Sequence, residues 1–235
     1  MIELYTWSTQ NARKVTIMLE ECELAYSIRP INLFKNEQKD EAFLAINPNG
    51  RVPALIDPDA PSGPVVVAES GAILIYLAEK TGKFLPPSGP ERYGALHWLM
   101  WQMSAVGPVF GNLAHFVAAV DPDSPRVNAY LRATMAPGVF AYPLKRFGDE
   151  AMRLVSVLER QLEGREFIAG ELSIADFATY AWFESIWAGF RARQPVIDDL
   201  NPNVAAWMTR LATRPHTRRG MERLAWGVDL EKESA

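Results

Sequence analysis

Cysteine and histidine are scarce in this chain of 235 residues, which has one cysteine and three histidines. The single cysteine, Cys22, cannot form an internal disulfide, and this slightly favours the reducing cytoplasm as the location. The histidines show no spacing typical of metal ligands, and His115 is only a weak candidate. We therefore predict that the protein uses no metal.

An excess of charge of either sign is also lacking. The 24 Lys and Arg residues against 28 Asp and Glu residues give a formal net charge of −4, so we expect no nucleic-acid partner. The N-terminus has no basic segment followed by a long apolar stretch, which argues against a signal peptide. No apolar run approaches the ~20 residues that span a bilayer, so we expect no membrane partner.

Strand and helix patterns alternate through the first third of the chain. Pro30 assigns one of the strands to a sheet edge or a bulge. Ser70 is the expected N-cap of the last helix, and Gly82 its terminator. The order strand, helix, strand, helix, strand, strand, helix predicts a small α/β domain over residues 1–84. The predicted strands are 2–7, 26–33, 52–59 and 65–70, and the predicted helices are 11–22, 39–48 and 70–82.

Only helical patterns follow the segment "KFLPPSGPER", whose three prolines and one glycine mark a domain boundary. We expect an all-helical domain over residues 91–228, with its first helix kinked or broken near Gly107-Pro108. Ser173 and Asp176 fit an N-capping box and are assigned to folding. Residues 121–138 are expected to form an extended loop, with or without a short helical turn. The predicted helices are 91–120, 142–164, 172–187 and 203–215.

Several local sequences, in their order and separation, resemble the glutathione transferases. They are "NGRVPALID" at 49–57, "AESGAILIYLAEKTG" at 68–82 and "GELSIADFATYAW" at 170–182. Within that family, "STQNARK", "HWLMWQMSAVGP" and "YPLKRFGDEAMRLVSVLERQL" look closest to the bacterial nu-class branch. The resemblance covers nearly the whole chain. It implies a thioredoxin-like N-terminal domain followed by a helical C-terminal domain, with 121–138 as an insertion of no assigned role.

The same resemblance implies a substrate class and an assembly. Nu-class proteins act on glutathione disulfide and small disulfides, and on some transferase and peroxide substrates. We therefore expect glutathione as the cosubstrate, a second small-molecule substrate and a homodimer. A runner-up interpretation is a binding or regulatory module without notable catalysis, because a fold does not fix a function.

Two dipeptides are implied to hold glutathione. A cis bond between Val52 and Pro53 would leave the backbone groups of Val52 unpaired, so that the cysteinyl part of the peptide could add as a short antiparallel strand. The alternative is a trans proline, since only about 5–6% of X–Pro bonds are cis. Glu69 would take the ammonium of the γ-glutamyl end, and Ser70 with the helix N-terminus its carboxylate. The alternative for Ser70 is a purely structural cap.

The opening turn is implied to hold the sulfur. Tyr5 lies within a strand and Cys22 lies on the apolar side of a helix, so Thr9 and Asn11 are the predicted hydrogen-bond donors. Lowering a thiol pKa of about 8.5 by ~2 units requires ~2.7 kcal/mol. A helix dipole supplies only ~0.3–1 kcal/mol, whereas a hydrogen bond to a charged group supplies ~1.5–3 kcal/mol. The alternative is that Ser8, Thr9 or Asn11 merely caps the first helix. The two roles are not exclusive, because one residue can cap while another faces the ligand.

More distant positions are implied by the resemblance as well. Gln38 would reach the glycyl carboxylate, with Arg51 and Lys35 as possible helpers. Arg146 would reach across a dimer to the neighbour's glutathione, or is simply solvated. Without a redox cysteine in the turn, sulfur exchange would occur between bound thiols. A further set of aromatic residues either lines a pocket for an apolar cosubstrate or belongs to the core, namely Trp98, Trp101, Phe110, His115 and Phe116.

Overall fold

The computed structural model describes residues 1–121 and 138–225. A four-stranded mixed sheet forms the centre of the N-terminal domain, in the order β2-β1-β3-β4. The strands are β1 (Ile2–Thr6), β2 (Tyr26–Pro30), β3 (Ala54–Asp57) and β4 (Val65–Ala68). β1 pairs in parallel with β2 and antiparallel with β3, which pairs antiparallel with β4. The edge position that Pro30 predicted for the second strand is confirmed.

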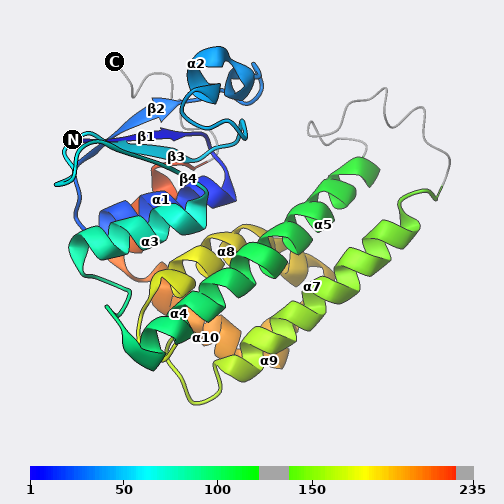
Figure 1. The fold of residues 1–235 in the computed structure, drawn as a ribbon. Helices are drawn as coiled ribbons and strands as arrows, with labels where there is room; N and C mark the ends of the chain where they lie inside the picture. Colours follow the sequence, from blue (N-terminus) through cyan, green and yellow to red (C-terminus); the bar gives the residue numbers. More distant parts are fainter. Residues whose placement is uncertain (122–137, 226–235) are drawn as a thin grey trace.

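Helices α1 (Gln10–Glu21) and α3 (Ser70–Thr81) lie between this sheet and the helical domain (Figure 1). Their buried faces share one core with the central strand, where Leu4, Val15 and Leu74 are fully buried. The short helices η1 (Glu37–Lys39) and α2 (Glu41–Leu44) complete the domain beyond β2. The predicted α/β domain is therefore confirmed as a thioredoxin-like arrangement.

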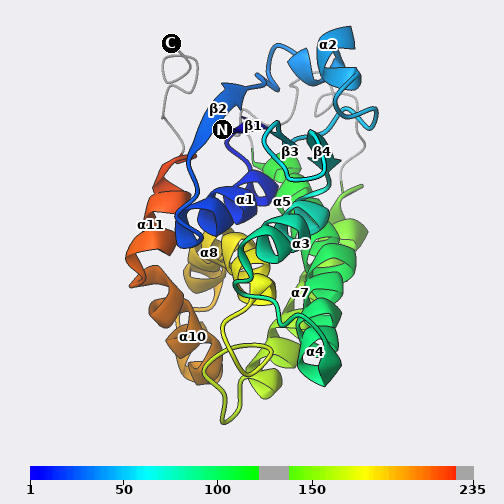
Figure 2. The same cartoon turned by 60° about the vertical axis from the view of Figure 1, so that its left-hand side comes forward.

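The C-terminal domain contains only helices among its described residues, as predicted. Figure 2 shows α11 lying along the outer side of α1, at the junction of the two domains. The elements are α4 (Gly89–Trp101), the π-helical turn η2 (Gln102–Val106), α5 (Gly107–Val120), α7 (Ala141–Gln161), α8 (Ile174–Arg193), α9 (Ile197–Leu200), α10 (Pro202–Ala212) and α11 (Pro215–Glu222). The predicted loop at 121–138 lies mostly outside the described residues.

The interruption predicted at Gly107-Pro108 takes a different form. The helix runs on from α4 through η2 to α5, because a π-helical turn precedes the proline. Proline lacks an N–H group and its ring clashes with the preceding turn. One wider turn accommodates both effects without ending the helix.

The central helix α8 begins at the capping box that the sequence predicted. The Ser173 side chain caps the helix, and Asp176 accepts hydrogen bonds from the N–H groups of Ser173 and Ile168 at 3.0 and 2.9 Å. Trp207 donates to the same carboxylate through its indole N–H at 2.9 Å. Burial raises the pKa of Asp176 to about 6, and these donors offset part of that effect. The box is thus a structural anchor inside the domain.

The long helix Gly89–Val120 corrects one expectation. By length and composition alone it could cross a membrane, since its most apolar window has a mean hydropathy of 1.4. It runs beside α7 and α8 in the helical domain, with 22% of that window buried. Such helices are weak evidence for a membrane span, but the statement that no apolar stretch is long enough does not hold for this one.

Candidate functional site

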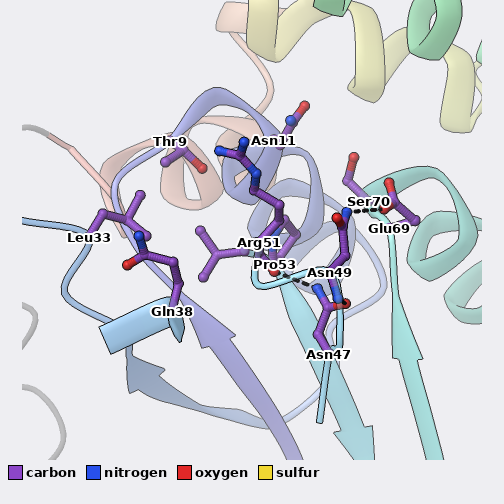
Figure 3. A pocket seen from close by; sticks show the side chains of 11 residues that line it. Thr9, Asn11, Leu33, Gln38, Asn47, Asn49, Arg51, Pro53, Glu69 and Ser70 are labelled. Atoms are coloured by element: carbon purple, nitrogen blue, oxygen red, sulfur yellow. Dashed lines mark hydrogen bonds between the residues drawn. The ribbon is translucent and has the colours of Figure 1, made fainter. Parts of the chain in front are cut away.

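A polar pocket of about 500 Å³ opens where the loops after β1 and before β3 meet the N-termini of α1 and α3. In Figure 3, Glu69 and Ser70 lie on one side of it and Leu33 and Gln38 on the other, with Pro53 between them. Its lining residues are Thr9, Asn11, Leu33, Gln38, Asn47, Asn49, Arg51, Val52, Pro53, Glu69 and Ser70. All the predicted glutathione contacts except Arg146 and the possible helper Lys35 are therefore brought together, from segments far apart in the sequence.

Thr9 is the N-cap of α1. Its side-chain oxygen accepts from the N–H of Ala12 at 3.2 Å, in an extended backbone conformation. This is the capping role that the sequence allowed. The hydroxyl proton is not used in that bond, so Thr9 can still donate into the pocket.

Asn11 is held by a residue of the other domain. The indole N–H of Trp182, on α8, donates to Asn11 Oδ1 at 3.0 Å. Because indole is a donor only, the amide oxygen must face Trp182, and the two N–H groups on Nδ2 stay available. The sequence contained no signal for this contact, since nothing local places position 182 beside the first turn.

The N-terminus of α3 requires one correction. Glu69, not Ser70, is the N-cap, because its backbone (φ 65°, ψ 117°) is outside the helical region and Ser70 is already the first helical residue. No side chain caps the first turn of this helix. Its free N–H groups therefore remain at the pocket, where they favour an anion. Glu69 itself accepts a hydrogen bond from the amide of Asn49 at 3.3 Å.

The Val52-Pro53 peptide bond is cis, as the resemblance implied. Among the described residues, neither backbone group of Val52 has a hydrogen-bond partner. The preceding turn is fixed by Asn47, whose side chain donates to the carbonyl of Arg51 at 2.6 Å and accepts from the N–H of Asn49 at 3.1 Å. The free backbone groups of Val52 can thus pair with an extended peptide.

The remaining polar residues lie at the far end of the pocket. Gln38 has a buried Oε1 without a partner in the described part of the chain, while its Nε2 lies 3.5 Å from Asn36 Oδ1. Nε2 carries two N–H groups, so it can make this contact and still donate to a carboxylate. Arg51 is exposed and projects over the pocket in Figure 3. Lys35, the other possible helper, is exposed and does not line the pocket.

Lys14 lies beneath the pocket and was missed at the sequence level. Only 1% of its surface is exposed. Its ammonium donates to Gln102 Oε1 at 2.5 Å and to Ser70 Oγ at 3.4 Å. Burial lowers the pKa of Lys14 to about 7, and the negative charge of Glu69 opposes part of that shift. The available signal was a lysine four residues before Met18, on the apolar face of α1.

Arg146 was predicted to reach a neighbour's glutathione, whereas Cys22 and Tyr5 were expected to take no part in handling the sulfur; all three are outside the pocket. Arg146 is exposed on α7 and lines no part of this pocket. Cys22 is buried beside Thr81 Oγ1 at 3.4 Å, and burial raises the pKa of its thiol, so its packing role is confirmed. Tyr5 donates to Glu3 at 3.3 Å and does not line the pocket.

A second cavity of about 1070 Å³ lies between α5, α7 and α8, with a mainly apolar lining that includes Leu113, Met152 and Phe190. Phe110 is the one residue of the predicted aromatic set that lines it. Trp98 and Trp101 instead pack against each other edge to face, with centroids 5.1 Å apart. In the described ranges 1–121 and 138–225, no group of three or more metal-ligating side chains occurs.

Comparison with known proteins agrees with this geometry. The family model of the glutathione S-transferase N-terminal domain matches residues 10–80, and that of the C-terminal domain matches residues 145–215. The disulfide-bond oxidoreductase YfcG of Escherichia coli is 38% identical, over 94% of this chain and 94% of its own length. The E. coli disulfide-bond oxidoreductase YghU is 34% identical, over 93% of this chain and 73% of its own length.

Solved structures show the same fold with ligands. A glutathione transferase family member from Pseudomonas fluorescens, with two glutathiones bound, has a TM-score of 0.81 and 37% identity, over 94% of this chain and 92% of that one. A Pseudomonas putida glutathione transferase with one glutathione disulfide per subunit has a TM-score of 0.80 and 34% identity, over 94% and 90% of the two chains. This chain therefore belongs to the glutathione S-transferase family.

Proposed function

We propose that this protein is a glutathione-dependent disulfide oxidoreductase, in which bound glutathione supplies the attacking thiolate. The observation that carries the proposal is the Asn11 amide: Trp182 holds its oxygen, and its N–H groups have no acceptor among the described residues. The curated relatives named as disulfide-bond oxidoreductases support it, as do the related structures that hold glutathione or its disulfide.

Glutathione fits the pocket in one direction. Its γ-glutamyl carboxylate would meet Ser70 and the uncapped N-terminus of α3, and Glu69 would take the adjacent ammonium. The cysteinyl backbone would pair with the free groups of Val52. The glycyl carboxylate would then lie toward Gln38 and Arg51 at the opposite side. This order leaves the sulfur near Thr9 and Asn11.

Thr9 and Asn11 would stabilise the thiolate by donating hydrogen bonds to it. Two donors at ~1.5–3 kcal/mol each exceed the ~2.7 kcal/mol that a two-unit fall in thiol pKa requires. The thiolate attacks one sulfur of the disulfide, a new S–S bond forms, and the leaving sulfur departs as a thiolate that takes a proton from water. A second glutathione thiolate then attacks the glutathione sulfur of the mixed disulfide. This forms glutathione disulfide and expels the other substrate sulfur as a thiolate, which is protonated by water. No cysteine of the protein takes part.

Peroxide reduction and conjugation to electrophiles would use the same activated sulfur. Comparing the turnover of hydroxyethyl disulfide with that of chlorodinitrobenzene separates disulfide reduction from conjugation. We expect the disulfide to be the better substrate by kcat/KM. A protein that binds glutathione-agarose but turns over neither compound would overturn the proposal and leave a binding module.

We also propose a homodimer and a cytoplasmic location. The helix Gly89–Val120 carries an apolar surface of which little is buried, and Tyr93 and Met100 on it are 71% and 48% exposed. A twofold partner against this face would cover it, and would let Arg146 reach the neighbouring pocket. Sedimentation analysis should show a dimer, and Met100→Glu should shift it toward the monomer.

Cell fractionation tests the proposed cytoplasmic location, which the reducing glutathione pool of that compartment favours.

A further inference from the structure

Lys14 carries a buried amino group that has no ionic partner among the described residues. Among the described residues it forms no ion pair, although its ammonium lies directly below the proposed γ-glutamyl site. Its three donors face Gln102 Oε1 at 2.5 Å, Ser70 Oγ at 3.4 Å and Met103 Sδ at 3.4 Å. All three acceptors are neutral, whereas a buried charge usually has an ionic partner.

The charged groups around Lys14 do not supply that partner. On α3, Glu69 is the carboxylate whose field reaches the ammonium, and it is engaged by Asn49. From α8, Glu184 lies 3.9 Å from Arg13 instead. At the other end of α1, Glu21 pairs with Arg214, the N-cap residue of α11, at 2.6 Å. The residues from η2, Gln102 and Met103, are uncharged.

We propose that Lys14 is the counter-charge of the γ-glutamyl carboxylate, acting through Ser70, and that Lys14 takes up a proton when glutathione binds. The inference rests on the proposed binding of glutathione in this pocket. It makes Lys14 a positioning residue, since the ammonium reaches the ligand through the Ser70 hydroxyl.

The hydrogen-bond direction explains how this works. A protonated Lys14 can only donate, so Ser70 Oγ must accept from it. The Ser70 hydroxyl donates to Met103 Sδ at 3.7 Å, and because a thioether is a weak acceptor this proton can turn to a bound carboxylate. That arrangement suits a carboxylate, which can only accept. A neutral amine has a lone pair and could accept the Ser70 proton, which would remove a donor from the ligand. Gln102 reinforces the protonated form, because its oxygen faces the same nitrogen.

The linkage has a definite sign. Burial places the pKa of Lys14 at about 7 in the free protein. A carboxylate beside Ser70 favours the ammonium and raises that pKa. Proton uptake on binding is therefore largest at a pH between the pKa of Lys14 in the free protein and its pKa in the complex. It vanishes at a pH well below the pKa in the free protein. Affinity should fall by up to about tenfold per pH unit across that window, then level off.

Calorimetry with S-methylglutathione tests this, because its blocked sulfur cannot release a proton. Binding is measured in two buffers of different ionisation enthalpy, at about pH 6 and about pH 8, the two sides of a pKa near 7. We expect net proton uptake at the higher pH and little at the lower one. γ-Aminobutyryl-cysteinyl-glycine methylated on sulfur, which lacks the γ-glutamyl carboxylate, should bind without uptake.

Variants separate Lys14 from its surroundings. Lys14→Met should abolish the proton uptake and weaken the binding of S-methylglutathione by about tenfold or more. A tenfold change in affinity corresponds to a shift of about one unit in the pKa of Lys14 on binding. The matched control Lys83→Met, at an exposed lysine outside the pocket, should change neither quantity. Uptake-free binding of S-methylglutathione to the parent protein would overturn the Lys14 proposal alone, whatever the stability of the variant. Failure of the parent protein to bind it at all would overturn the proposed function as well.

Discussion

Replacement of Asn11 by alanine removes one of the two proposed hydrogen-bond donors to the glutathione sulfur. It does not disturb the cap of α1, which is made by Thr9. Asn11 is not needed for the fold beyond its one hydrogen bond to Trp182. Loss of a hydrogen bond to a thiolate costs about 1.5–3 kcal/mol. The pKa of bound glutathione should therefore rise by about 1 to 2 units in Asn11→Ala. Turnover below that pKa should fall by about 10- to 100-fold.

The assay follows hydroxyethyl disulfide reduction as a function of pH at saturating glutathione. In the parent protein the rate should level off above the lowered thiol pKa. In Asn11→Ala the rising limb should move to higher pH, while the glutathione dissociation constant changes little. Thiolate absorbance in the ultraviolet, titrated with bound glutathione, reports the same pKa without any turnover.

Two further variants make the result interpretable. Asn112→Ala, at an exposed asparagine on α5 whose amide donates only to the carbonyl of Pro108, should behave like the parent protein. Trp182→Phe keeps the Asn11 amide but frees it to rotate, so its pH profile should shift in the same direction by less. An equal loss of affinity and turnover in Asn11→Ala, or an unmoved pH profile, would refute the sulfur-activating role.

Three other outcomes follow from the contacts. Ser70→Ala should weaken glutathione binding by about 10- to 100-fold with a smaller effect on kcat, and an unchanged dissociation constant in calorimetry would remove Ser70 from the site. Gly220→Ala places a Cβ 2.5 Å from Ile17 Cα, so α11 must shift. We expect the free energy of unfolding in urea to fall by about 1–3 kcal/mol, and an unchanged midpoint would contradict the packing of α11 on α1. Cys22→Ala should retain the disulfide reductase rate, and its loss would point to a protein mixed disulfide.

Local patterns were sufficient to predict most of the fold. Alternation and helical spacing placed most strands and helices within a few residues, and Pro30 correctly indicated an edge strand. The pattern ended α8 six residues too early, at 187, and did not predict α9 or α11. The cap of α3 was misplaced by one residue because Glu69 adopts a positive φ that glutamate rarely occupies. Residue type gives no warning of such a conformation when tertiary contacts impose it.

The site was predictable only where its residues lie in short motifs. Thr9, Val52 and Glu69 each belong to a recognisable turn, and the pocket contains all three. Trp182 and Gln102 come from the second domain, so their contacts with α1 depend on how the domains pack. Arg146 illustrates the opposite limit, because its predicted role requires a second copy of the chain.

Helix α1 links the two domains to the site. Its first turn carries Asn11, which α8 orients through Trp182, and its second turn places Lys14 between Ser70 and η2. Its outer side is held by α11, and the carbonyl of Leu224, two residues after that helix, accepts from the Ser8 hydroxyl at 2.6 Å. The helical domain therefore orients the hydrogen-bond donors Asn11 and Lys14, although both belong to the N-terminal domain. For this reason the N-terminal domain alone would keep the pocket-lining residues but lose the contacts that fix Asn11 and Lys14, and with them the chemistry proposed for the sulfur.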